Sequence, residues 1–341
     1  MKRTIVLIPG DGIGPEVSDA ARRVLDAAGA NLAWVEHHAG VAALERGSTT
    51  TLPEETLAAI REHGVALKGP CSTPIGGGFS SVNVGLRKAL NLYGAVRPVR
   101  SMDGVKTRYE GVDLIVVREN TEGLYSGIEN VVTEGVVTSL KVATEKACRR
   151  IARFAFELAE SRGRKKVTAI HKANIMKLTD GLFLRCCREE HERSGKKVEY
   201  DEKIIDAAFM LLVQDPSRFD VLLCENLYGD VVSDLCAGLV GGLGVTPGSN
   251  IGDEQAVFEA VHGSAPDIAG KGIANPLAMI MSSVMMLNYL AYDRGDVRQA
   301  EVARRIKEAY NAALLAGEKT RDLGGTLGTR EFADAIIARL A

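Results

Sequence analysis

The 341-residue sequence lacks the features that mark several specialised classes of protein. It has no uninterrupted apolar stretch of about 18 residues, so we expect no membrane partner, and its first apolar run is too short for a signal sequence. The six cysteines form no Cys-x-x-Cys pair and have no histidine at zinc-finger spacing. We therefore expect reduced, mostly structural thiols in a cytoplasmic protein.

The sequence also has no large excess of positive or negative charge. The 42 basic and 44 acidic residues leave a net charge of −2, and no basic run or aromatic–basic interleaving of the kind found in nucleic-acid binders is present. Nucleic acid is therefore not an expected partner. What remains is a globular composition, 46% hydrophobic and 25% charged, in a chain long enough for roughly two domains.

Short apolar strands alternate with amphipathic helices, which predicts an α/β fold with a largely parallel sheet. Pro15 opens the first helix, and a long apolar helix from Leu277 is expected to be buried. Residues 128–142 depart from the alternation, because two β-prone runs about a Glu-Gly turn predict a hairpin. We expect that hairpin to be an arm that pairs with a second subunit. The other expected strands include residues 4–10, 112–120, 166–174, 198–207 and 220–229.

The motif GDGIGPE, which begins at Gly10, follows a strand and precedes a helix, as a dinucleotide-binding glycine loop does. Its spacing fails, because Pro15 stands where that motif needs glycine or alanine. The second strand ends with only a doubtful acidic candidate, Glu36. We therefore do not expect a Rossmann fold, and we predict that these glycines form a tight turn lining a cleft.

Hydroxyls, an amide and two arginines surround a glycine run in residues 71–100. Either Ser80 or Ser81 is expected to cap a helix that runs to about Leu90. Two guanidinium groups aimed at one place repel each other unless carboxylates or phosphates lie between them. A pocket for a polyanion and an ordinary surface turn both remain open. The residues concerned are Ser81, Asn83, Arg87 and Arg97.

Acidic residues form a second constellation. On a helix that starts near Gly229, Asp230 and Asp234 present two carboxylates on one face, and Asp206 offers a third. Ligands that are all oxygen suit Mg²⁺ or Mn²⁺ rather than zinc. The alternative is that Asp230 favours a helix N-terminus and Asp234 is solvated.

A third cluster contains a tyrosine and a lysine. Arg118 and Tyr125 lie in RENTEGLYSGIE, and Lys172 and Asn174 lie in HKANIMK. A tyrosine and a lysine near a metal can exchange protons once their surroundings disfavour the lysine charge. Lys172 directly follows an apolar strand, where the loops of α/β proteins commonly carry function. Half-exposed surface residues are the alternative for both.

These segments, in this order, resemble the isocitrate and isopropylmalate dehydrogenase family of β-decarboxylating dehydrogenases, and more closely its NAD-dependent isocitrate dehydrogenases. The resemblance covers essentially the whole chain. It implies oxidation of isocitrate to 2-oxoglutarate and CO₂ with NAD⁺ and with Mg²⁺ or Mn²⁺. The motifs that carry it are GDGIGPE, KGP, TPIGGG, the Ser-x-Asn-x-x-x-Arg helix, RPVR, RENTEGLYSGIE, HKANIMK, NLYGDVVSD and HGSAPDIAGKGIANP.

The resemblance assigns roles residue by residue. Lys172 is implied to remove the proton of the substrate C2 hydroxyl as hydride leaves for the nicotinamide, and Tyr125 to return a proton to C3. The tricarboxylate is implied to contact Ser81, Asn83, Arg87, Arg97 and Arg118. The implied metal ligands are Asp206, Asp230 and Asp234. The implied cofactor contacts are Thr73, Glu259, His262, Gly263, Ala265, Asp267, Ile268 and Asn275.

The implied architecture is an isopropylmalate-dehydrogenase-like two-domain fold with a mixed, largely parallel sheet. Residues 1–98 and 252–341 are expected to form a large domain, and residues 99–251 a small domain with the hairpin and the dimer contact. The resemblance further implies a homodimer, or a higher oligomer built from it, with shared active sites. Lys172 and Asp206 are then supplied to each site by the neighbouring subunit.

Specificity is expected to depend on two places. Ser81 and Asn83 offer hydrogen bonds to the γ-carboxylate of isocitrate, which disfavours isopropylmalate, whereas homoisocitrate is the harder rival. Asp267 favours NAD, since a carboxylate accepts hydrogen bonds from a ribose diol but repels a 2′-phosphate, although Arg321 is a nearby cation that could tolerate NADP. A non-catalytic regulatory subunit is the alternative outside enzymes. The presence of Tyr125, Lys172 and all three aspartates argues against it.

Overall fold

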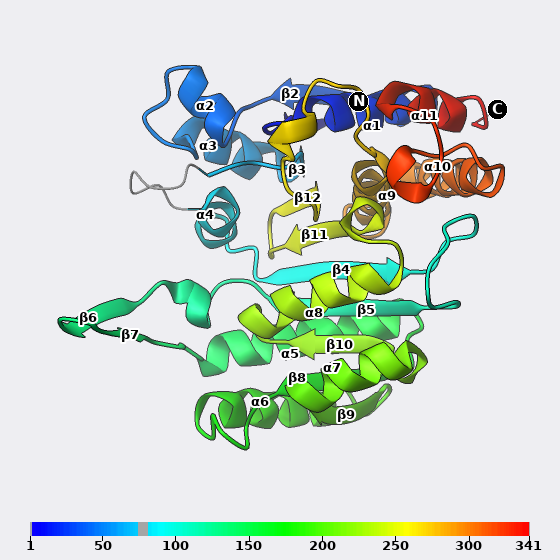
Figure 1. Cartoon of the computed structure of the whole chain (residues 1–341). Coiled ribbons are helices and arrows are strands. Elements are labelled where there is room, and N and C mark those ends of the chain that lie inside the picture. The colour runs from blue at the N-terminus through cyan, green and yellow to red at the C-terminus, as the bar shows by residue number, and fades with distance from the viewer. Residues whose placement is uncertain (1, 74–80, 341) are drawn as a thin grey trace.

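The computed structural model describes residues 2–73 and 81–340, so Ser80 and the glycine run lie outside the described residues. Within them, one sheet has the order β2-β1-β3-β12-β11-β4-β5-β10-β8-β9 and runs from one end of the molecule to the other (Figure 1). Its strands are β1 (Arg3–Ile8), β2 (Leu32–Glu36), β3 (Val65–Lys68), β4 (Gly94–Arg100), β5 (Asp113–Glu119), β8 (Lys166–His171), β9 (Glu199–Ile204), β10 (Val221–Cys224), β11 (Pro247–Ile251) and β12 (Ala256–Ala260).

The sheet is mixed. Strands β1, β2, β3 and β12 are parallel to one another, and so are β5, β8, β9 and β10. The two sets are joined by β4 and β11, which pair antiparallel with both of their neighbours. The predicted α/β fold with a mixed, largely parallel sheet is confirmed. Strands β4 and β11 carry the sheet across the expected domain boundaries, and the division into two domains stays a prediction.

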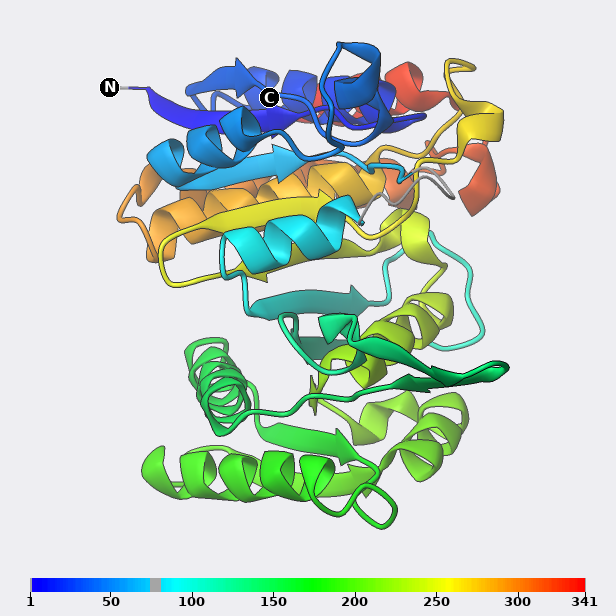
Figure 2. The same ribbon diagram turned by 90° about the vertical axis from the view of Figure 1, so that its left-hand side faces the viewer.

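Helices cover both faces of the sheet (Figures 1 and 2). Side chains alternate along β5, so that Leu114 and Val116 pack in a core with α1 and α7–α11, whereas Ile115 and Val117 pack in a second core with α5 and α6. A third core lies under α3 and α4. The helices are α1 (Gly14–Ala27), α2 (Val41–Glu45), α3 (Glu54–His63), α4 (Val82–Ala89), α5 (Glu145–Ser161), α6 (Thr179–Arg193), α7 (Ile205–Gln214), α8 (Asn226–Leu239), α9 (Leu277–Tyr292), α10 (Arg298–Leu315) and α11 (Thr329–Ile337).

Two of the expected elements differ from the structure. The strand expected over residues 198–207 ends at Ile204, and Asp206 lies in the first turn of α7. That segment is helical because its buried residues, Ala208 and Leu212, are four apart. Helix α8 begins at Asn226 rather than near Gly229, since a preceding glutamate side chain caps it. Pro15 in the first turn of α1 and the burial of α9 are as expected.

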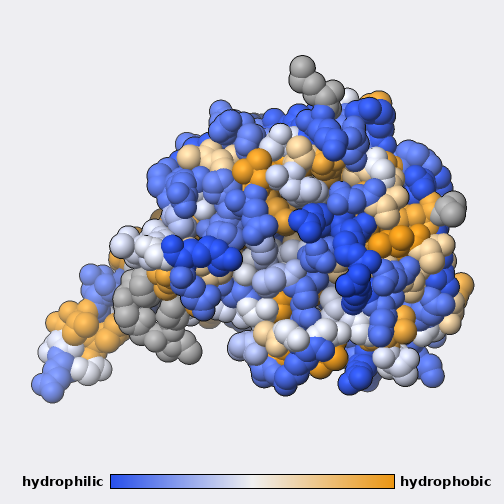
Figure 3. Space-filling model, turned by 90° about the horizontal axis from the view of Figure 1, so that it is seen from above, coloured by the Kyte–Doolittle hydropathy of each residue, from blue (hydrophilic) through white to orange (hydrophobic). Residues whose placement is uncertain are grey.

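The expected hairpin is confirmed. Strands β6 (Glu129–Thr133) and β7 (Val136–Ser139) pair antiparallel and project from the body of the molecule (Figures 1 and 2). Apolar side chains cover part of the arm (Figure 3), and Val131 and Val137, which face each other across it, are 75% and 64% exposed. Within residues 2–73 and 81–340, no helix is both long and apolar enough to span a membrane.

Candidate active site

Three buried arginines form one wall of the candidate site. Arg97 lies on β4 and Arg118 on β5. Because Arg97 pairs in register with Val116, the two arginine side chains lie on the same face of the sheet, two positions apart. Arg87 comes from α4, and none of the three arginines is more than 6% exposed. Such burial is unlike that of an ordinary surface turn, and the polyanion pocket stays a prediction.

Among the described residues, Arg97 has no carboxylate at ion-pair distance, whereas Arg87 lies 3.6 Å from Glu259 and Arg118 pairs with Asp230. Burial, together with the charges of Arg87 and Arg118, lowers the pKa of Arg97 to about 10. Burial also lowers the pKa of Arg87, although Glu259 opposes the change. The Nε atom of Arg97 is buried and has no hydrogen-bond partner among the described residues. A buried donor of this kind favours an anionic ligand that accepts from it.

Glu259 lies on β12 next to Arg87. Its carboxylate is 2.7 Å from the Lys68 amine and 3.6 Å from the Arg87 guanidinium. Burial alone would raise the pKa of Glu259, but the two cations more than offset it, and the pKa falls to about 2. Asn250 bridges the pair, because its Nδ2 donates to Glu259 at 2.7 Å and its Oδ1 accepts from Arg87 at 3.2 Å. Within one chain, Glu259, one of the implied cofactor contacts, therefore holds Arg87 in place.

The start of α8 fixes Arg118. Its Nε and Nη2 donate to Asn226 Oδ1 at 3.0 and 2.7 Å, and its Nη1 donates to Asp230. A Cβ on Gly229 would lie 2.5 Å from Arg118 Cγ, so only a glycine allows the helix to pack this closely on the arginine. The hydroxyl of Tyr125 donates to Asp230 as well, and the Arg118 guanidinium lies 5.0 Å from the centre of the Tyr125 ring.

This arrangement sets the protonation of two groups. Burial raises the pKa of Asp230, but Arg118 and the hydrogen bond from Tyr125 outweigh it, so that the pKa is lowered and Asp230 stays ionised. Burial and the bond to Asp230 raise the pKa of Tyr125, which therefore keeps its proton. The pair combines a fixed negative charge with a hydroxyl that can donate.

The three aspartates expected to bind a metal do not meet within one chain. Asp234 lies one turn after Asp230 on α8, and partial burial of its carboxyl group raises its pKa, to which the charge of Asp230 adds. Asp206 pairs instead with Lys172, whose backbone N–H donates to Asp180 at 2.7 Å. Among the residues that the structure describes, no three Asp, Glu, His or Cys side chains lie close enough to hold a metal ion. Two carboxylates on α8 fit part of an oxygen site, and the resemblance implies that Asp206 of the partner subunit completes it.

The N-terminus of α4 differs from the expectation. Ser81 stands at the N-cap position, but its side chain makes no capping bond, so the prediction is wrong for this residue. Thr73 Oγ1 supplies an acceptor instead, at 3.4 Å from the backbone nitrogen of Val82, which leaves the exposed Ser81 hydroxyl available to a ligand. Asn83 Oδ1 is buried without a hydrogen-bond partner among the described residues. Both side chains suit a ligand with several acceptors and donors.

Five of the residues predicted to contact the cofactor line one cavity of about 440 Å³. Asn275 is fixed there by Asp322, to which its Nδ2 donates at 2.9 Å. Burial lowers the pKa of His262, so its imidazole is neutral, and its Nε2 has no hydrogen-bond partner in the described part of the chain. Asp267 is exposed on the adjoining 3₁₀ turn Pro266–Ile268. The five residues are His262, Gly263, Ala265, Ile268 and Asn275.

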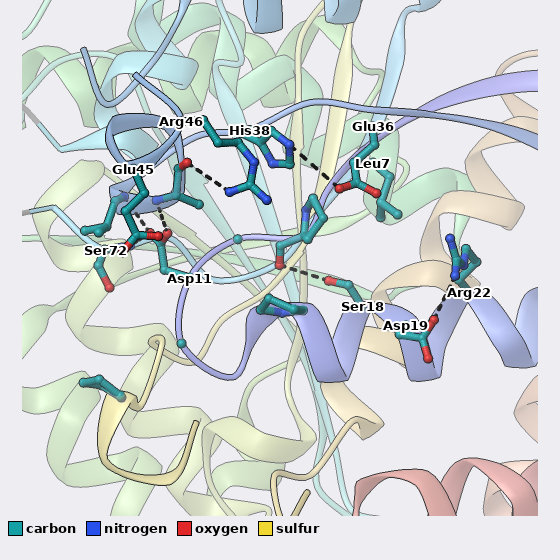
Figure 4. A pocket seen from close by; sticks show the side chains of 17 residues that line it. Leu7, Asp11, Ser18, Asp19, Arg22, Glu36, His38, Glu45, Arg46 and Ser72 are labelled. Atoms are coloured by element: carbon teal, nitrogen blue, oxygen red, sulfur yellow. Dashed lines mark hydrogen bonds and ion pairs between the residues drawn. The ribbon is translucent and has the colours of Figure 1, made fainter. Parts of the chain in front are cut away.

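A second cavity, of about 490 Å³, lies beside the turn between β1 and α1 (Figure 4). Gly10 and Gly12 line it with positive φ angles of 86° and 59°, which confirms the predicted tight turn beside a cleft. Charged side chains pair with one another around this cavity, for example Arg22 with Asp19 at 2.9 Å. The turn between the two glycines contains Asp11, which is buried.

Sequence reasoning missed several residues that shape the site. Lys68 ends a strand whose four residues are all buried, and a lysine in such a strand is a signal for a buried acidic partner. Asn226 and Asp322 give no comparable signal, because each acts on a residue far away in the sequence. Asp180 gives no clear signal either, although its side-chain carboxylate accepts from the backbone N–H of Lys172 and pairs with Lys141.

The chain is similar to known proteins over almost its whole length. The family model described as isocitrate/isopropylmalate dehydrogenase matches residues 4–336. The mitochondrial catalytic subunit 5 of NAD isocitrate dehydrogenase from Arabidopsis thaliana is 51% identical, over 99% of this chain and 88% of the relative. A mitochondrial regulatory subunit of the NAD isocitrate dehydrogenase from Dictyostelium discoideum is 49% identical, over 98% and 91%. The crystal structure of isocitrate dehydrogenase from Methylococcus capsulatus has a TM-score of 0.93 and 49% identity, over 100% of this chain and 99% of that one.

Proposed function

Because this chain belongs to the isocitrate/isopropylmalate dehydrogenase family, we propose that it oxidises and decarboxylates isocitrate to 2-oxoglutarate and CO₂, with reduction of NAD⁺. The observation that carries the proposal is the cluster of three buried guanidinium groups. One of them, Arg97, has no carboxylate at ion-pair distance and retains a buried donor without a partner among the described residues. A substrate with three carboxylates supplies that negative charge.

The side chains of the site have separate roles in the proposed reaction. Arg87, Arg97 and Arg118 bind the carboxylates, and Asn83 and Ser81 orient the γ-carboxylate. Lys172, as a neutral amine, takes the proton of the C2 hydroxyl, and Tyr125 gives a proton to C3 after CO₂ has left. The raised pKa of Tyr125 suits this donation, since the hydroxyl still carries its proton at neutral pH.

The same site is proposed to need a divalent ion. Asp230 and Asp234 of one chain and Asp206 of the partner subunit would hold Mg²⁺ or Mn²⁺, because oxygen-only ligands suit these ions. When bound there, the ion supplies positive charge that lowers the pKa of the C2 hydroxyl and stabilises negative charge on the substrate. Support comes from the two carboxylates one turn apart on α8, whose mutual repulsion a cation relieves.

We further propose a homodimer with shared active sites, from which a higher oligomer can assemble. Lys172 and Asp206 pair with each other, and no hydrogen bond in the described part of the chain joins either to Tyr125 or Asp230. Exposed apolar side chains follow Lys172 directly, with Leu178 88% exposed, and others cover the hairpin arm. A second copy of the chain would bury both surfaces. The two subunits from Arabidopsis thaliana and Dictyostelium discoideum are named mitochondrial. A cytoplasmic location remains a proposal for this chain, and cell fractionation tests it.

Homoisocitrate and isopropylmalate are the alternative substrates, and a regulatory role is the alternative outside catalysis. One relative is named a regulatory subunit, so identity alone does not separate the two roles. The retained Tyr125, Lys172 and three aspartates support the catalytic role.

A spectrophotometric assay of NAD⁺ and NADP⁺ reduction with each of the three acids, with Mg²⁺, with Mn²⁺ and with a chelator, tests the proposal. We expect the highest kcat/KM with isocitrate, NAD⁺ and metal. Ser81→Leu with Asn83→Leu should lower that value by orders of magnitude. Failure with all three acids would overturn the proposal.

A further inference from the structure

The buried carboxylate of Asp11 joins three segments of the chain. Asp11 follows β1, is 8% exposed, and accepts hydrogen bonds only from backbone N–H groups in the part of the molecule described. Its Oδ1 accepts from Ala42 at 2.7 Å, and its Oδ2 accepts from Val41 at 3.0 Å and from Ser72 at 2.6 Å. Bonds to an ionised acceptor are stronger than neutral ones. Asp11 therefore holds Ser72 against the start of α2 (Figure 4).

The backbone reserves space for this carboxylate. Gly40 has a φ of 80°, and a Cβ added to it would lie 2.0 Å from Asp11 Oδ2. Gly12, next to Asp11, has a φ of 59°, and its added Cβ would lie 2.0 Å from the carbonyl oxygen of Ser264. Two glycines in conformations that other residues rarely adopt thus allow the close approaches on either side.

Ser72 connects Asp11 to the loop that lines the cavity predicted to hold the cofactor. Its N–H is bonded to Asp11, and its hydroxyl lies 2.6 Å from the hydroxyl of Ser264. The carbonyl of Ser264 accepts from the backbone N–H of Ile13 at 2.8 Å. Ser264 belongs to the loop that lines the 440 Å³ cavity, between Gly263 and Ala265. The residue after Ser72, Thr73, accepts from the first turn of α4.

From this chain of contacts we infer that Ser72 and Ser264, held by Asp11, are positioning residues that couple the substrate wall to the cofactor loop. A ligand bound against the loop of Ser264 fixes that hydroxyl, which fixes Ser72 and, through Thr73, the start of α4. Helix α4 carries Asn83 and Arg87. Each ligand therefore raises the affinity of the other, by the same factor in both directions. The inference rests on the proposed function, because it takes isocitrate and NAD as the two ligands.

The experiment measures that factor directly in the full-length protein. The Kd of isocitrate is determined by calorimetry with Mg²⁺, without NADH and with saturating NADH, so that no turnover occurs. The ratio of the two Kd values is the coupling factor, expected between about 5 and 150 for the wild type. Ser72→Ala and Ser264→Ala should each lower the factor several-fold towards one, with the Kd of isocitrate alone changed less than about twofold. The double variant should lower it no further, because both changes break one bond.

Two controls separate coupling from stability. Ser48→Ala removes a hydroxyl from an exposed loop, where its bonds to described residues are all to Thr50, and should leave the factor unchanged. Ser72→Thr keeps the hydroxyl and should restore most of the factor. Melting temperatures of all variants are measured in parallel.

A wild-type factor near one, or an unchanged factor in both alanine variants, would overturn the inference while leaving the proposed function intact. A wild-type protein that neither binds nor oxidises isocitrate would overturn the proposed function itself.

Discussion

The close packing of Gly229 on Arg118 allows a matched test of the site. An added Cβ at residue 229 would lie 2.5 Å from Cγ and 2.6 Å from Cβ of Arg118, closer than such atoms can approach. Gly238 lies on the same helix, and its added Cβ would have no neighbour within 4 Å among the described residues. Gly229→Ala and Gly238→Ala are therefore the same chemical change, with and without a clash.

Helix propensity, overpacking and the loss of a hydrogen bond set the expected changes in stability and in kcat/KM. Either substitution gains about 1 kcal/mol of helix propensity. Overpacking at Gly229 costs about 1–3 kcal/mol. The free energy of unfolding of Gly229→Ala should therefore be about 1–3 kcal/mol lower than that of Gly238→Ala. Relief of the clash moves Arg118, and a hydrogen bond to a charged group is worth about 1.5–3 kcal/mol. Losing one such bond to the transition state lowers kcat/KM roughly 10–150-fold.

Urea denaturation and steady-state kinetics with isocitrate measure the two effects separately. Gly238→Ala should be at least as stable as the wild type and fully active. Gly229→Ala should lose far more kcat/KM than its change in stability accounts for. If both variants match the wild type in kcat/KM, the packing of α8 on Arg118 does not position a substrate ligand, and the reasoning is refuted.

Three further predictions concern charge and assembly. The folded pKa of Glu259, about 2, lies below its ordinary value of 4.5, so its ionisation stabilises the fold above about pH 4.5, and this contribution is lost as the pH falls towards 2. The free energy of unfolding should therefore fall by on the order of 3 kcal/mol over that range, and less steeply in the double variant Glu259→Gln with Lys68→Met. Asp267→Lys should raise the ratio of kcat/KM for NADP⁺ over NAD⁺ at least about tenfold, and an unchanged ratio would contradict the role given to this carboxylate. Val131→Lys with Val137→Lys should yield an inactive monomer in light scattering, whereas an intact, active dimer would exclude the arm from the interface.

The sequence predicted the parts of the site that depend on local pattern. The parallel strands, the tight turn at Gly10 and the hairpin follow from periodicity and turn residues, and the structure has them. The cap of α4 did not follow from local pattern. Ser81 stands at the preferred position, yet the hydroxyl of Thr73, nine residues before Val82, accepts the bond from the Val82 backbone nitrogen.

Other features depended on contacts that no local pattern encodes. The strand predicted over residues 198–207 ends at Ile204, because burial of one helical face makes the following residues part of α7. The Lys68–Glu259 pair joins adjacent strands that are nearly two hundred residues apart in sequence. The pairing of Asp206 with Lys172, away from Asp230, is a further case, because these contacts depend on the tertiary fold.

The late insertion of β11 and β12 into the sheet has a consequence for synthesis of the protein. Strands β3 and β4 are neighbours only through β11 and β12, which leave the ribosome roughly 150 residues after β4. At about 5–20 residues per second, the facing edges of β3 and β4 stay unpaired for roughly 10–30 seconds. Open strand edges recruit other chains, so the nascent protein has a defined interval in which chaperone binding protects it most.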